Sequence, residues 1–144
     1  LGSFYWLQGQ VHEAINLFSK GRKLALTFNN KQYNLISILN ISLCKIDILE
    51  LEEALELLYE YKDLAESQNY DGLVKVSYFC LAMVNSCLGF KEKALYFAEK
   101  VYRELPLRYQ TPWAIGYGFL FLGLAYRKLD QIEKSLHLYN QAIS

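Results

Sequence analysis

The chain has 144 residues, of which 53% are apolar and 21% are charged. This composition excludes an intrinsically disordered protein, and the length is enough for a single domain, residues 1–144, with a substantial core. Lysine plus arginine equals aspartate plus glutamate, at 15 each. Because the formal net charge is zero, the chain has no long-range electrostatic attraction to nucleic acid or to an anionic membrane surface.

The apolar pattern predicts an all-α protein with helices arranged in pairs, because no stretch alternates with the period of a strand. The first helix of each pair falls near residues 1–8, 32–47, 72–88 and 112–128. The second helix falls near residues 11–28, 51–67, 91–104 and 132–144. Turns are predicted at residues 9–10, 29–30, 49–50, 68–71, 89–90, 106–112 and 129–130. Pro112 is well placed to begin a helix, since its missing N–H has no partner in a first turn anyway.

The chain repeats itself with a period of about 40 residues. Small residues recur at the same place in the second helices, with separations of 40, 40 and 41 residues: Ala14, Ala54, Ala94 and Ser135. A second set occupies the first helices, where a missing side chain lets two helices pack closely: Gly2, Ser42, Ala82 and Gly123. The repeat units therefore span approximately residues 1–30, 31–70, 71–108 and 109–144.

This pattern resembles the tetratricopeptide repeat (TPR) family. The last unit carries it most fully, with Leu122-Gly123, Tyr126, Ser135, Tyr139 and Ala142 in the family's order. The second unit departs from it, because Lys45 stands at the usual tyrosine and Leu49 at the usual turn glycine. The period is also longer than the family's usual ~34 residues. In this longer period the chain resembles the helical arms of signalling regulators and adaptors. The resemblance implies a right-handed α-solenoid of antiparallel helix pairs, with about four units.

Both terminal units look truncated. Leu1 begins partway through a first helix, and Ser144 follows the last small residue of a second helix. Neither shows the polar outer face that caps a repeat array. We therefore expect the chain to be a fragment of a larger protein or a longer array.

The resemblance also implies a concave groove lined by the first helix of each pair. The residues expected to line it are Trp6, Ile36, Leu39, Leu43, Ile46, Val76, Phe79, Met83, Tyr117, Leu120, Leu124 and Arg127. Because nearly all are apolar, we expect the module to bind an amphipathic helix or an apolar segment of another protein. A clamp for a C-terminal carboxylate is not expected, since Leu39, Leu43, Phe79 and Met83 stand where Lys, Asn and Arg would project.

Three other interpretations of the groove stay open. In the first, the groove is packed internally and the chain is a regulatory or sensor arm of a multidomain signalling protein. In the second, the chain is a structural spacer of a longer array and the groove binds no partner. In the third, the groove binds a second copy of the chain. A separate run of acidic residues in 50–66 reads as a solvated outer face or, alternatively, as a patch for a basic partner.

No motif of catalysis, cofactor binding or metal binding is found, so we expect a protein that is not an enzyme. His12 and His137 have no Cys, Asp or Glu at metal-ligand spacing. The three cysteines, Cys44, Cys80 and Cys87, form no CxxC pair and read as free thiols in a reducing, cytoplasmic setting. The uncharged apolar stretch 113–126 is short for a membrane span of ~20 residues and carries three glycines.

Overall fold

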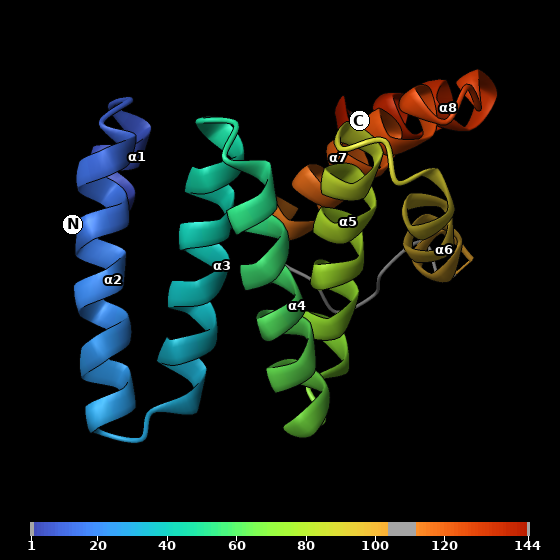
Figure 1. Cartoon of the computed structure of the whole chain (residues 1–144). Coiled ribbons are helices and arrows are strands. Elements are labelled where there is room, and N and C mark those ends of the chain that lie inside the picture. The colour runs from blue at the N-terminus through green and yellow to red at the C-terminus, as the bar shows by residue number, and fades with distance from the viewer. Residues whose placement is uncertain (1, 104–111, 144) are drawn as a thin grey trace. The chain divides into compact units, whose positions relative to one another are not determined.

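The computed structural model describes residues 2–103 and 112–143, with the side chains of 112–115 left out. Over these residues the protein is all-helical and has no strand (Figure 1). The helices are α1 (Gly2–Leu7), α2 (Val11–Thr27), α3 (Lys31–Asp47), α4 (Leu51–Ser67), α5 (Asp71–Cys87), α6 (Lys91–Tyr102), α7 (Pro112–Lys128) and α8 (Ile132–Ile143). Every described boundary lies within two residues of the predicted one, and Pro112 begins a helix as expected. The predicted loop at 106–111 and the predicted helix ends at 1, 104 and 144 lie outside the described residues.

Each described turn contains one residue with positive φ. These residues are Gly9, Asn29, Leu49, Asn69, Gly89 and Asp130, and the first five are spaced exactly 20 residues apart. At each turn the next residue donates its N–H to a carbonyl five positions back, as Phe90 does to Asn85 at 2.9 Å. The carbonyl of Phe90 then accepts the N–H of Ala94, the first such bond of the next helix. The residue after the one with positive φ therefore ends one helix with its N–H and begins the next with its carbonyl.

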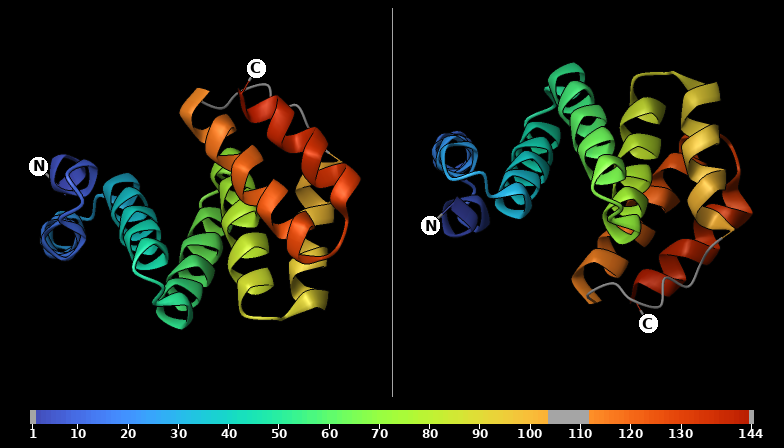
Figure 2. Two further views of the ribbon diagram at one scale, coloured as in Figure 1. Left: turned by 90° about the horizontal axis from the view of Figure 1, so that it is seen from above. Right: turned by 90° about the horizontal axis from the view of Figure 1, so that it is seen from below.

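The chain divides into two compact units, Leu1–Leu64 and Ala65–Ser144, and the division falls within α4. In unit 1, α2 packs against both α1 and α3. In unit 2, α5 packs against α6 and α7, and α7 packs against α8. Both views of Figure 2 show the α7–α8 pair lying across the α5–α6 pair. Packing of neighbouring helices in pairs is thus confirmed.

The small residues at the repeat positions lie in the core, as the 40-residue period predicts. Ala14, Ala54 and Ala94 are fully buried, and Ser135 is 2% exposed. Two glycines of the first helices, Gly2 and Gly123, lie at close approaches between helices: a methyl group added to Gly123 would lie 2.6 Å from the Tyr139 ring. The same substitution at Gly2 would place the methyl 2.6 Å from the Phe18 ring. These two glycines therefore each face an aromatic ring of the second helix in their own pair.

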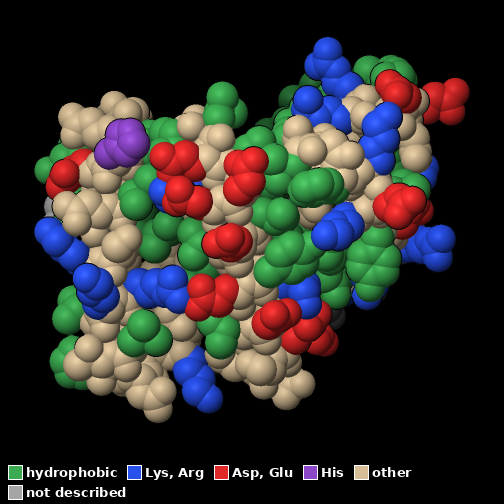
Figure 3. Space-filling view, in the orientation of Figure 1, with side chains coloured by type: hydrophobic (Ala, Val, Ile, Leu, Met, Phe, Trp, Pro, Cys, Tyr) green, Lys and Arg blue, Asp and Glu red, His purple; other side chains and the backbone are tan. Residues whose placement is uncertain are grey.

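Part of the acidic run 50–66, at the start of α4 and along it, holds unit 1 together. Glu50 and Glu53 both pair with the half-buried Lys45 of α3, and Glu60 pairs with Arg22 of α2. Arg22 also donates to the Asn34 side chain of α3 at 3.3 Å. Figure 3 shows the acidic side chains gathered on the front of this unit, with basic ones beside them. Asp63 pairs with Lys62 at 2.7 Å as well, so these four acidic side chains bind the chain's own cations. That pairing argues against a patch for a basic partner at these positions.

Among residues 2–103 and 112–143, no helix is both long enough and apolar enough to cross a bilayer.

Replacing Leu49 by glycine is expected to stabilise the protein. Leu49 holds φ at 62° and is 78% exposed, so the substitution relieves a left-handed backbone at little loss of packing. The free energy of unfolding should rise by about 1 kcal/mol. Chemical denaturation measures this change. Leu136→Gly is the control, because that exposed leucine lies inside α8, and should cost about 1 kcal/mol. Equal losses at both positions would contradict the assignment of strain at Leu49.

Replacing Gly123 by alanine is expected to destabilise the protein. The added methyl must displace the Tyr139 ring, and overpacking of this kind costs about 1–3 kcal/mol. Gly21→Ala is the matched substitution, and we expect it to raise the free energy of unfolding. Its methyl group would meet only the Ser37 hydroxyl at 3.8 Å, so better helix propensity should add about 0.5–1 kcal/mol. Thermal unfolding of both variants tests the close approach, which a stabilising Gly123→Ala would disprove.

Candidate partner-binding faces

The predicted groove residues belong to two sets, one in each unit. Within unit 1, Ile36 is the most exposed of them at 45%, and Leu39 and Ile46 are half-buried on the same helix. Trp6 of α1 is also half-buried, and its indole N–H donates to the Asp47 carboxylate at the end of α3. This bond joins α1 to the C-terminal end of α3, and Ile36, Leu39 and Ile46 form an apolar, partly exposed row along α3.

Within unit 2, the predicted residues of α7 form a continuous stripe. Tyr117, Leu120, Leu124 and Arg127 follow one another at spacings of three and four, which puts them on one helix face. Tyr117 is 39% exposed, Leu120 is 43% exposed, and Arg127 is exposed at the C-terminal end. The Tyr117 ring packs edge-on against Phe121, with centroids 5.8 Å apart. These four residues, named the α7 stripe below, present apolar surface that ends in a positive charge.

The remaining predicted residues are more deeply placed. Val76 on α5 is half-buried, whereas Phe79 and Met83 are each 2% exposed, and Leu43 on α3 is 4% exposed. Phe79 is covered because Gly118 of α7 lacks a side chain: an added methyl would lie 2.7 Å from the Phe79 ring. In this structure Leu43, Phe79 and Met83 belong to the core, so a partner could reach them only if the helices moved apart.

A polar network that sequence reasoning missed joins three helices of unit 2. Glu99 of α6 accepts from the Tyr126 hydroxyl of α7 at 2.8 Å and from the Lys134 ammonium of α8 at 2.6 Å. The bond to Lys134, with help from Tyr126, holds the pKa of Glu99 below its usual value, against the opposing effect of burial. Burial, with the nearby Glu99 carboxylate, raises the pKa of Tyr126, which stays protonated as a donor.

Lysines of unit 2 also lie over aromatic rings. Lys134 is 5.1 Å from the Tyr102 ring centroid and 4.8 Å from that of Tyr126. Lys100 is 4.9 Å from the Tyr96 centroid and 5.4 Å from that of Tyr78. These cation–π contacts engage both lysines with the protein's own side chains.

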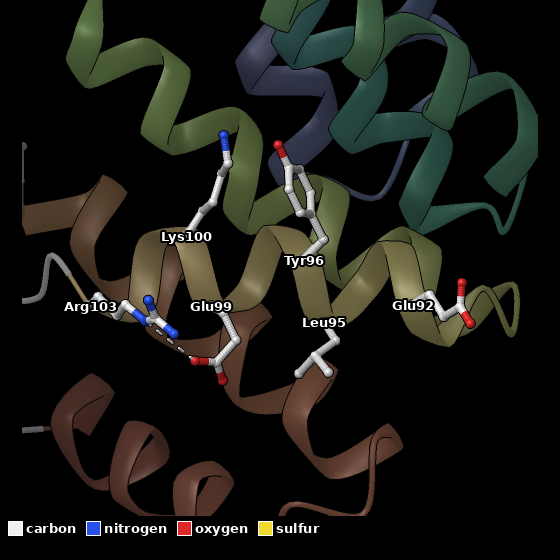
Figure 4. A pocket seen from close by; sticks show the side chains of 6 residues that line it. All are labelled: Glu92, Leu95, Tyr96, Glu99, Lys100 and Arg103. Carbon is white, nitrogen blue, oxygen red and sulfur yellow. Dashed lines mark ion pairs between the residues drawn. The ribbon is translucent and has the colours of Figure 1, made fainter.

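A surface pocket of about 450 Å³ lies along α6, lined by Glu92, Leu95, Tyr96, Glu99, Lys100 and Arg103. Figure 4 shows Tyr96 and Lys100 pointing to one side of α6, and Glu99 and Leu95 to the other. Three of its charged groups are engaged within the protein: Glu99 binds Tyr126 and Lys134, Lys100 lies over two rings, and Arg103 pairs with Glu99 at 3.9 Å. We therefore assign Glu99 and Lys100 to holding the helices together.

A second pocket, of about 420 Å³, lies between α2 and α3, where sequence reasoning predicted no site. Gly21, Leu24, Ala25 and Phe28 line it from α2, with Asn30 of the turn and Tyr33 and Ser37 of α3. This pocket is named the α2–α3 hollow below. A signal for it was present in the sequence, because two small residues and two large apolar ones recur at helical spacing over 21–28.

The nucleophilic and metal-ligating side chains are dispersed. Cys44 and Cys80 are buried, and burial raises their thiol pKa to about 11 and about 12, which keeps both protonated and poorly reactive. His12 and His137 are exposed on α2 and α8. In the part of the chain that the structure describes, no three His, Cys, Asp or Glu side chains are grouped to hold a metal ion.

The chain was compared with known proteins. A scan against models of protein families finds no match, and a search of curated proteins finds none either.

Replacing Glu99 by glutamine is expected to destabilise the protein in a pH-dependent way. The folded pKa of Glu99 is lowered, so its carboxylate stabilises the fold above its ordinary pKa of ~4.3. That contribution is lost as the pH falls through the lowered value. At pH 7 the variant should lose about 1 kcal/mol, and near pH 3 the two proteins should converge.

Thermal unfolding across pH 3–8 measures the difference between the two proteins. Glu92→Gln is the control, because Glu92 is an exposed glutamate on the same helix. A gap that persists unchanged at low pH would show that the carboxylate charge is not what stabilises the network.

Proposed function

We propose that the protein is a protein–protein interaction module of the tetratricopeptide type, which binds an amphipathic helix or apolar segment on its first-of-pair helices. The observation that carries this proposal is the α7 stripe, where a tyrosine and two leucines remain partly exposed at helical spacing. Ile36 of α3, which is 45% exposed, has the repeat position that Tyr117 has on α7. Apolar surface thus recurs at equivalent places in both units.

The stripe has the chemistry of a receptor for one helix face. Covering ~500 Å² of apolar surface would contribute ~12 kcal/mol before the costs of association, which is ample for micromolar affinity. Arg127 at its end adds a preference, because its guanidinium is suited to a carboxylate beside the partner's apolar residues. A helix with large aliphatic residues three and four apart and an acidic residue at one end meets both requirements.

A second candidate function rests on a different observation. The burial of Leu43, Phe79 and Met83 at 2–4% exposure is what an internally packed groove requires. In that case the module would be a regulatory arm whose helices separate when a ligand or neighbouring domain acts on it. In the first function the folded chain binds an apolar helix as it stands. In the second it does so only after its helices have separated.

Selection from a displayed library of amphipathic helical peptides tests the proposal. Binders are then measured by fluorescence anisotropy against Leu120→Glu and Ile36→Glu, which replace exposed side chains and should leave the helical circular dichroism unchanged. Because a buried charge opposes apolar docking, each variant should weaken binders at its own face by roughly tenfold or more.

The matched control is Leu136→Glu, which alters a 57% exposed leucine on α8, a second-of-pair helix. It should leave affinity unchanged. Binders that are insensitive to Leu120 and Ile36, or a library that yields none, would favour the internally packed arm.

A further inference from the structure

Helix α6, in the middle of unit 2, keeps one face open although the helices before and after it are in place. It packs against α5 and against α7. Leu95 is nevertheless 37% exposed and Tyr96 is 56% exposed. The pocket of about 450 Å³ lies along these two residues (Figure 4). The contacts that α6 makes with its neighbours in the repeat therefore use its other faces.

Four residues that line this pocket form a strip along α6, named the α6 strip below: Glu92, Tyr96, Glu99 and Arg103. Their spacings of four, three and four residues put them on one helix face. The same spacings are met when the helix is followed in the opposite direction. The acidic Glu92 and the basic Arg103 stand at opposite ends in Figure 4. Among the described helices, α6 alone has an acidic residue in its first turn and a basic one in its last.

A second copy of α6 that lies antiparallel to the first meets this strip with complementary groups. The reversed direction places Glu92 opposite Arg103 and Tyr96 opposite Glu99, and two-fold symmetry repeats each contact. Both ends then hold a carboxylate–guanidinium pair, for which the forked donors of arginine are suited. A parallel copy would instead bring Glu92 against Glu92 and Arg103 against Arg103. The charge order of the strip therefore selects the antiparallel arrangement.

The polar groups of the strip have bonding capacity left for such a partner. Glu92 is exposed and forms no ion pair within the described part of the chain. The Arg103 side chain is 80% exposed, and its ion pair with Glu99 Oε2 is long, at 3.9 Å. The short bonds from α7 and α8 to Glu99 both go to Oε1. Oε2 is thus placed to accept the Tyr96 hydroxyl of a second copy.

We propose that two copies of this chain form a dimer through antiparallel α6 strips. Leu95 stands beside the strip and is covered in the pair, which removes apolar surface from water. Because α6 has 12 residues, the contact is only ~18 Å long. An interface of this size is small, so we expect a dissociation constant of roughly 10–100 µM. The α6 strip is separate from the α7 stripe, so either proposal can fail without the other.

Sedimentation velocity of the 144-residue chain, at concentrations on both sides of this constant, measures the monomer–dimer equilibrium. A reductant prevents a disulfide through the half-buried Cys87. Glu92→Arg or Arg103→Glu alone brings like charges together at both ends of the pair, so each should weaken the dimer roughly tenfold or more. The double variant restores both pairs in reversed order and should dimerise like the unmodified chain. Glu133→Arg, at an exposed glutamate of α8, is the matched control and should change nothing.

Circular dichroism should be the same for all of these variants, because the replaced side chains are exposed. A chain that stays monomeric at every concentration would overturn the proposal, and so would a dimer that both single reversals leave intact. A double variant as weak as the single ones would show that Glu92 and Arg103 do not face each other. A dimer that Leu120→Glu abolishes would assign self-association to the α7 stripe and not to α6.

Discussion

A single backbone constraint sets the geometry of this protein: every described helix-to-helix turn takes one residue with positive φ. That residue reverses the chain, and the residue after it donates to a carbonyl five positions back while its own carbonyl starts the next helix. A 20-residue spacing between turns gives helices of 17 residues for α2 to α5. Within unit 1, α2 and α3 have equal lengths and pack side by side between successive turns.

The side chains at the turn position show how strongly the architecture imposes this conformation. Glycine holds it at Gly9 and Gly89, and asparagine or aspartate holds it at three others, all of which tolerate positive φ. Leu49 adopts the same conformation without any intrinsic preference for it. Its turn is supported by Lys45, whose carbonyl accepts the Glu50 N–H and whose ammonium binds the Glu50 and Glu53 carboxylates. Tertiary contacts thus replace a missing glycine.

The same packing decides which apolar surface is available for binding. In unit 2, Gly118 lets α7 pack closely over Phe79, which is buried there, and the neighbouring face of α7 remains partly exposed. In unit 1 the α2–α3 hollow is bordered by Leu24 and Phe28, which are 60% and 76% exposed.

The sequence by itself determined the helices, their ends and the buried small residues, because apolar periodicity and turn residues act over a few positions along the chain. It also placed Ile36, Tyr117, Leu120 and Leu124 on faces that the structure leaves partly exposed. It could not determine that Phe79 and Met83 are buried, because that depends on how closely α7 approaches α5. Nor could it determine the Glu99 network, whose partners lie 27 and 35 residues away. Such groups meet only when three helices have docked, so tertiary packing alone decided them, as it decided the α2–α3 hollow.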